Sequence, residues 1–144
     1  MYFEEFILGT KLDLNDVVIN KDDIFEFAKK YDNIPLHTDE EYAKSTNFGA
    51  LIAPGVMSFM SVWAQYLKID LAGTELIAGK SAKIEWIKPV FAGDVLKGIC
   101  EVTNLTKRNE KNGIVELSFD VYNQKNELVL TNVTEMIVKC RISD

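Results

Sequence analysis

Residues 55–67 read GVMSFMSVWAQYL, and this segment decides the fold. As a helix it has hardly any polar face, because its apolar residues point in every direction: Val56, Met57, Phe59, Met60, Val62, Trp63, Ala64, Tyr66 and Leu67. A helix that is apolar nearly all round is a buried helix. In a chain of 144 residues, a sheet must wrap around it. The segment therefore predicts a central helix from Gly55 to about Leu67, enclosed by a β-sheet.

The strands for that sheet follow the helix in sequence. Four segments are rich in β-branched and aromatic residues, and apolar and polar residues alternate along them: residues 81–90, 95–105, 114–124 and 128–141. Asn112-Gly113 is a strong hairpin signal between the second and third segments, and Lys125-Asn126 a weaker one between the third and fourth. Runs of strands after runs of helix indicate the α+β class. The length and the lack of a linker predict one domain, residues 1–144.

The N-terminal half holds the candidate chemistry. A helix is predicted over about 21–31, with Asn20 as its N-cap. Pro35 disfavours helical geometry at the residue before it, so the chain must turn between Asp32 and His37, the single histidine. A carboxylate and an imidazole on one ordered turn can share a water and move its proton. The alternative is a chance spacing, with His37 a surface or structural residue.

Composition excludes several function classes. Apolar residues make up 47% and charged residues 26% of the chain, which is ordinary for a globular protein. The net charge of −6 argues against a nucleic-acid surface, which needs clustered Lys and Arg. The first residues lack a basic region, and no apolar run reaches the roughly 18 residues that span a bilayer. We therefore expect a cytoplasmic protein without a membrane partner.

Metal and redox chemistry receive no support from the sequence. Cys100 and Cys140 are isolated in strand-like segments, without metal-ligand spacing and without a second histidine. Buried reduced thiols are the better interpretation. The sequence predicts no metal and no other cofactor.

Residues 27–59, FAKKYDNIPLHTDEEYAKSTNFGALIAPGVMSF, carry a family resemblance. They resemble the signature of the MaoC-like, (R)-specific enoyl-CoA hydratases, which reads Asp-x-Asn-Pro-x-His, a short acidic helix, Phe-Gly, and Ile-Ala-His-Gly-Met. Asp32, Pro35 and His37 match this signature. Residues 86–96, WIKPVFAGDVL, resemble the family's Pro-Val-x-x-Gly-Asp turn, and residues 119–138 its closing strands. The likeness runs from Tyr2 to Lys139 and implies the hotdog fold, a long antiparallel sheet around one helix.

Two positions depart from the family's pattern. Ile34 stands where the family has Asn, whose side chain helps to hold the loop by hydrogen bonds. Pro54 stands where the family has His. A proline at the beginning of a helix loses no needed bond, because the first N–H groups of a helix lack intrahelical acceptors.

The resemblance implies a reaction, the reversible addition of water to a trans-2-enoyl thioester to give a (R)-3-hydroxyacyl thioester. Asp32 and His37 would activate the water and move its proton. The N–H of Gly55 would hold the thioester carbonyl, and the missing side chain would let substrate approach the backbone. A glycine required only by a tight loop is the alternative for Gly55.

Two other functions fit the same sequence. One is a non-catalytic acyl-CoA-binding protein, in view of Ile34. The other is a hotdog acyl-CoA thioesterase, which usually places Asp or Glu on the central helix, where this chain has neither. CoA and acyl carrier protein are both acceptable carriers, and the family likeness implies at least a homodimer.

Two groups of side chains are candidates for contact with a ligand. Lys80, Lys83 and Lys88 can supply charge to the phosphates of CoA, or can be solvated lysines on a strand. Five large side chains line an acyl tunnel or simply fill the core: Phe48, Met57, Met60, Trp63 and Trp86.

Overall fold

A six-stranded antiparallel sheet curls around one long helix in the computed structural model, which describes residues 1–69 and 71–142. The helices are α1 (Lys21–Tyr31), α2 (Pro35–Thr38), α3 (Glu40–Lys44) and α4 (Gly55–Ile69), with 3₁₀ turns η1 (Phe3–Glu5) and η2 (Gly73–Glu75). The strands are β1 (Lys11–Asp13), β2 (Val17–Val18), β3 (Leu76–Trp86), β4 (Val95–Lys107), β5 (Asn112–Tyr122) and β6 (Leu128–Lys139).

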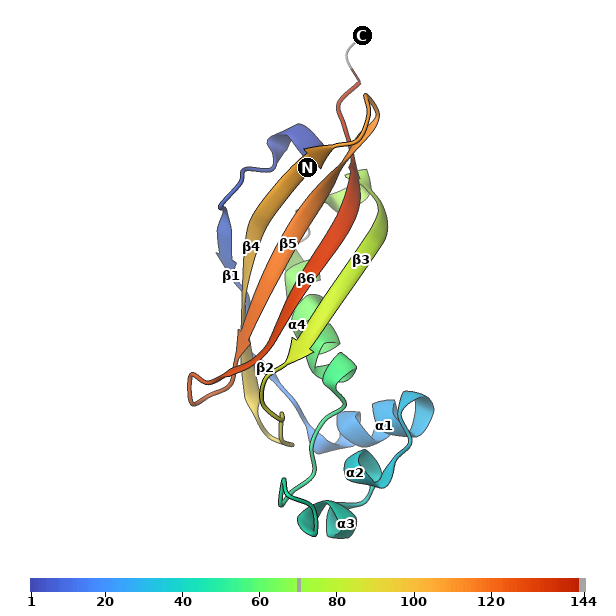
Figure 1. The fold of residues 1–144 in the computed structure, drawn as a ribbon, viewed down its shortest axis with the longest axis vertical. Coiled ribbons are helices and arrows are strands. Elements are labelled where there is room, and N and C mark those ends of the chain that lie inside the picture. Colours follow the sequence, from blue (N-terminus) through green and yellow to red (C-terminus); the bar gives the residue numbers. More distant parts are fainter. Residues whose placement is uncertain (70, 143–144) are drawn as a thin grey trace.

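The strand order is β1-β4-β5-β6-β3, and β2 pairs with another part of β4. Every pairing is antiparallel. Helix α4 lies against the sheet, while α1, α2 and α3 gather beyond one end of it, beside the beginning of α4 (Figure 1). The predicted α+β class and hotdog fold are therefore confirmed.

Aromatic packing holds α4 on the sheet. The ring of Phe119 on β5 lies 5.7 Å from each of the rings of Phe59, Trp63 and Tyr66. These distances, with the edge-on geometry to Phe59 and Tyr66, are favourable for aromatic pairs. The ring of Phe119 is fully buried, so it anchors the helix at the centre of the core.

Helix α4 is not buried all round in the single chain. Val56, Met60 and Leu67 are each close to half exposed. Strand β3, at the edge of the sheet, is exposed along almost its whole length. The sequence pattern predicted a helix without an open face, so this apolar surface is a departure from the prediction.

The predicted hairpin turns have different outcomes. Lys125-Asn126 does lie in the turn between β5 and β6, where Asn126 has φ 59°. Asn112-Gly113 instead begins β5, with Gly113 opposite Lys107. A Cβ atom at Gly113 would lie 2.5 Å from the ring of Phe3. Glycine is needed there because of packing against the N-terminal segment, not because of a turn.

The described residues contain neither a membrane-spanning helix nor a metal site. No helix of residues 1–69 and 71–142 is long and apolar enough to cross a bilayer. Within the same ranges, His, Cys, Asp and Glu form no group of three arranged to hold a metal ion. Cys100 and Cys140 are both buried and free of disulfides, as predicted.

Candidate active site

The end of α1 positions Asp32. Asn20 caps the beginning of this helix by accepting the Asp23 N–H at 3.0 Å, as predicted. Asp32 caps its end, and its N–H donates to the Ala28 carbonyl at 2.9 Å. The carboxylate therefore projects from a fixed helix end, with its side chain 44% exposed.

Pro35 places His37 opposite this carboxylate. Ile34 has the extended backbone that a residue before proline favours, with φ −124° and ψ 151°. Pro35 then begins the short helix α2, and the His37 N–H donates to the Ile34 carbonyl at 3.0 Å. The predicted loop is thus a single helical turn, which carries the imidazole inward.

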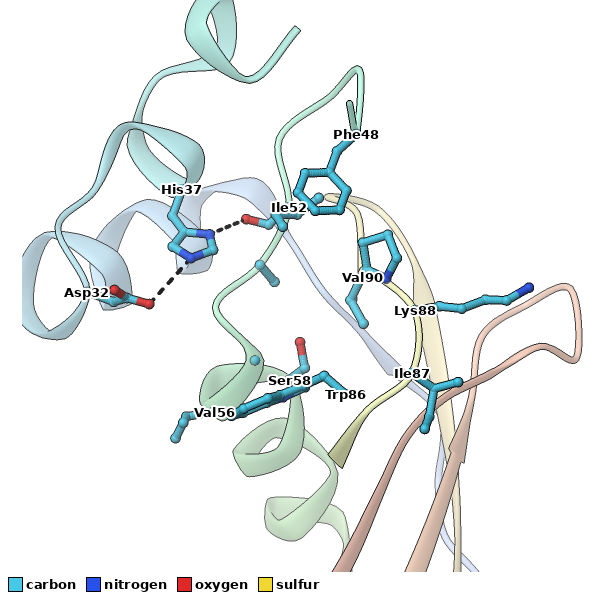
Figure 2. A pocket seen from close by; sticks show the side chains of 13 residues that line it. Asp32, His37, Phe48, Ile52, Val56, Ser58, Trp86, Ile87, Lys88 and Val90 are labelled. Carbon is cyan, nitrogen blue, oxygen red and sulfur yellow. Dashed lines mark hydrogen bonds and ion pairs between the residues drawn. The ribbon is translucent and has the colours of Figure 1, made fainter. Parts of the chain in front are cut away.

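The imidazole of His37 bridges two partners, as Figure 2 shows. Its Nδ1 lies 2.8 Å from the Ile52 carbonyl oxygen, and its Nε2 lies 3.3 Å from Asp32 Oδ2. A carbonyl only accepts, so Nδ1 carries a hydrogen and donates it. The contact between Nε2 and Oδ2 is an ion pair whenever the imidazole is protonated. His37 is buried, and the sequence prediction of an Asp32–His37 pair matches this geometry.

The Ile52 carbonyl is a functional group that sequence reasoning missed. Residue 52 forms a β-bridge with Phe91, and the Ala53 N–H donates to the Val90 carbonyl at 2.8 Å. Asp94 closes the turn that follows, because its Oδ2 accepts the Phe91 N–H at 2.9 Å. The Pro-Val-x-x-Gly-Asp segment therefore holds the backbone that fixes the tautomer of His37.

A cavity of about 480 Å³ opens beside the pair. Asp32, His37 and Gly55 line it together, so the three predicted site residues share one cavity. Its other walls are mostly apolar and come from the segment before α4, from α4, from the last residue of β3 and from the loop that follows it: Phe48, Ile52, Ala53, Val56, Ser58, Trp86, Ile87, Lys88, Pro89 and Val90. Such a lining suits a largely apolar ligand, with one Asp–His pair at its edge.

Gly55 is glycine for a different reason from the one predicted. A Cβ atom at this position would lie 2.1 Å from Nε1 of Trp86 and 2.2 Å from its Cε2. The space that a side chain would take is therefore filled by the indole, not left open for substrate. The N–H of Gly55 still belongs to the first turn of α4, where backbone donors lack intrahelical acceptors.

The three predicted lysines have different places. Lys88 lines the cavity and forms an ion pair with Glu127. Lys80 pairs with Glu135 at 3.4 Å, and Lys83 pairs with Glu85 at 3.2 Å, both on the sheet and outside the cavity lining. Only Lys88 of the three is placed to meet a ligand.

The five candidate tunnel residues lie in three different places. Phe48 and Trp86 line the cavity. Met57 is buried in the core and Trp63 packs against it. Met60 and Met57 border a different hollow, between α1 and α4.

Ile34 and Pro54, the two departures from the family pattern, do not disturb the backbone hydrogen bonds around the site. The Ile34 carbonyl accepts both the His37 N–H and the Thr38 hydroxyl, the latter at 3.0 Å, and the Ile34 side chain is outside the cavity lining. Pro54 precedes α4, and its carbonyl accepts the Ser58 N–H at 3.1 Å. Proline therefore costs this helix no hydrogen bond.

The fold and the site together define a hotdog-fold protein with an Asp–His pair beside the first residue of its central helix. The chain belongs to the family of the MaoC like domain, whose model matches residues 5–123. It is 29% identical over 140 residues to the uncharacterized protein YdeM of Bacillus subtilis, covering 96% of this chain and 99% of that protein.

Two solved structures extend the comparison. A structure of the monoamine oxidase regulatory protein of Archaeoglobus fulgidus superposes with a TM-score of 0.93 and 32% identity, covering 99% of this chain and 96% of the other. The (R)-hydratase PhaJ1 of Pseudomonas aeruginosa superposes with a TM-score of 0.77 and 26% identity, covering 99% and 92%.

Proposed function

We propose that this protein adds water reversibly to a trans-2-enoyl thioester and forms a (R)-3-hydroxyacyl thioester. The observation that carries the proposal is the 3.3 Å contact between His37 Nε2 and Asp32 Oδ2 at the edge of an apolar cavity. The (R)-hydratase name of the Pseudomonas aeruginosa structure supports the same reaction.

The geometry suggests how protons move in this reaction. Because Nδ1–H of His37 is committed to the Ile52 carbonyl, only Nε2 and the Asp32 carboxyl group exchange protons with water. The hydroxyl of the water adds to C3, and the pair takes the second water proton. A proton then passes from the pair to C2, so the pair ends in the protonation state in which it began. The two groups lie 3.3 Å apart and are proposed to act as a unit.

Gly55 is proposed to hold the thioester oxygen through its N–H. Negative charge grows on this oxygen while the double bond is attacked, so a fixed donor stabilises the transition state more than the substrate. Lys88 is the cavity's cation and suits the phosphate of a pantetheine arm, which CoA and acyl carrier protein both present.

A homodimer belongs to the same proposal. Strand β3 is an exposed edge of the sheet, and an exposed edge invites pairing. The apolar side chains Val56, Met60 and Leu67 on the adjacent helix supply surface that association would bury. Pairing of two copies along β3 would cover both features.

A non-catalytic acyl-thioester-binding protein is the second candidate. The Archaeoglobus fulgidus structure carries the name of a regulatory protein, and Ile34 replaces the family's Asn. Thioester hydrolysis is less favoured, since α4 contains neither Asp nor Glu over Gly55–Ile69.

One assay separates these functions. The purified protein is incubated with crotonyl-CoA while the conjugated thioester absorbance and free thiol are both followed. A hydratase removes the conjugation without releasing thiol. Release of thiol would indicate a thioesterase, and binding without either change would indicate a sensor and refute the proposal.

A further inference from the structure

The indole of Trp86 lies directly on the backbone of Gly55. Trp86 is the last residue of β3, and Gly55 is the first residue of α4. The atoms nearest to a Cβ built at Gly55 are Nε1 at 2.1 Å, Cε2 at 2.2 Å and Cδ1 at 2.8 Å, all of the indole. The five-membered ring, with its N–H, therefore rests beside the residue proposed to hold the thioester oxygen; Figure 2 shows the Trp86 indole among the side chains that line the cavity.

The two N–H groups have a spacing that suits one shared acceptor. The Cβ built at Gly55 lies 2.1 Å from Nε1 of Trp86. Two bonds of about 1.5 Å join this Cβ to the Gly55 nitrogen through Cα, so the two nitrogens lie within roughly 5 Å of each other. Two donors with such a spacing can each reach one oxygen at a hydrogen-bond distance of about 2.9 Å. Both residues line the cavity that also contains Asp32 and His37.

The indole N–H has no acceptor from the part of the chain that the structure describes. An indole nitrogen only donates, so it is free to bond a ligand's oxygen but no ligand's N–H. Trp86 is 55% exposed although its side chain is among the largest apolar side chains of the molecule. A donor of this kind at the wall of an apolar cavity is matched to a carbonyl oxygen.

We propose that Trp86 is a catalytic residue whose indole N–H, together with the Gly55 N–H, binds the thioester oxygen during hydration. This inference rests on the proposed hydratase function. Attack of water at C3 moves electrons from the double bond toward the carbonyl oxygen, and they return when C2 receives its proton. The indole donor bonds this oxygen most strongly while it carries charge, so it accelerates the reaction rather than only binding substrate.

A Trp86→Phe variant separates this role from that of a cavity wall. Phenylalanine keeps an aromatic ring on Gly55 but lacks the N–H. Loss of one such donor lowers kcat by about 10²–10³ in a site closed to water, and we expect at least a tenfold loss here because Trp86 is half exposed. The inhibition constant of butyryl-CoA, which cannot be hydrated, should rise only a few-fold, clearly less than kcat falls.

Trp63→Phe is the matched control. Trp63 is the other tryptophan of the chain, packs in the core against Phe119, and is absent from the cavity lining. This variant should keep the wild-type kcat. Unchanged kcat in Trp86→Phe, or a loss confined to KM, would overturn the role of the indole as a donor.

A second measurement does not depend on how well the variant folds. Wild-type protein labelled with ¹⁵N-tryptophan should give two indole N–H signals, since the chain has two tryptophans. Butyryl-CoA should move the Trp86 signal to higher proton frequency and leave the Trp63 signal in place; the Trp63→Phe spectrum assigns them. A Trp86 signal that stays in place with bound butyryl-CoA would refute the inference.

Failure of the inference and failure of the proposed function give different results. If wild-type protein does not hydrate crotonyl-CoA, the proposed function is wrong and the inference falls with it. If wild type and Trp86→Phe hydrate crotonyl-CoA equally well, the proposed function stands and only the inference is wrong.

Discussion

Replacing Gly55 with alanine should destabilise the protein only while Trp86 is present. The new Cβ would lie 2.1 Å from Nε1, whereas an ordinary contact needs about 3.5–4 Å, so the indole must move by roughly 1.5 Å. Trp86 sits at the end of an edge strand and is half exposed, so we expect it to swing outward.

The size of the effect follows from the area that the indole loses. A tryptophan buries up to about 250 Å², and Trp86 is 55% exposed, so roughly 100 Å² is at stake. At about 25 cal/mol per Å² this is about 2.5 kcal/mol, as an upper value. Alanine gains about 0.5–1 kcal/mol over glycine in a helix, so Gly55→Ala should cost about 1–2 kcal/mol net.

A double-mutant cycle with urea unfolding measures this coupling. In a Trp86→Ala background no ring opposes the new methyl group, so Gly55→Ala should be neutral or should stabilise by up to about 1 kcal/mol. The coupling free energy is then about 2 kcal/mol. An equal cost of Gly55→Ala in both backgrounds would show that the indole does not lie on Gly55 and would refute the reasoning.

Three further predictions concern other parts of the molecule. Burial raises the pKa of the Cys100 thiol to about 12, above the roughly 8.5 of an unfolded cysteine. The contribution of this thiol to stability is therefore full below about pH 8.5 and is lost as the pH rises toward 12. The unfolding free energy of Cys100→Ala should fall less between pH 8 and pH 10 than that of wild type, and equal slopes would contradict the shift. Ile34→Asn should leave the turnover of crotonyl-CoA unchanged or raise it, because backbone bonds already close the turn; abolished turnover would mean that the Ile34 side chain is required. Sedimentation at micromolar concentration should show at least a homodimer, and a strict monomer with full activity would contradict pairing along the exposed β3 edge.

Features that depend on neighbouring residues could be predicted from the sequence. The Asn20 cap, the turn forced by Pro35 and the approach of Asp32 to His37 all follow from local backbone rules. The apolar segment that begins at Gly55 predicted the central helix, because a helix with so few polar residues is buried against a sheet.

Features that depend on distant contacts could not be predicted in this way. The Ile52 carbonyl carries no side-chain signal, and its place depends on a bridge to Phe91. Asn112-Gly113 has the sequence of a hairpin turn, but glycine is needed at position 113 to make room for Phe3, far away in the chain. The reason for Gly55 is likewise a contact with Trp86 on another element. Family resemblance gave the topology, which periodicity alone left open.

The most direct test compares the conversion of crotonyl-CoA to (R)-3-hydroxybutyryl-CoA by wild type, Asp32→Asn and His37→Ala. General acid–base groups contribute roughly 10²–10⁴ in rate, so each variant should be at least about a hundredfold slower while keeping its fold by circular dichroism. Asp120→Asn, which alters an exposed carboxylate on β5, is the control and should match wild type. Near-normal hydration by either folded variant of the pair would contradict the proposal that Asp32 and His37 add the water.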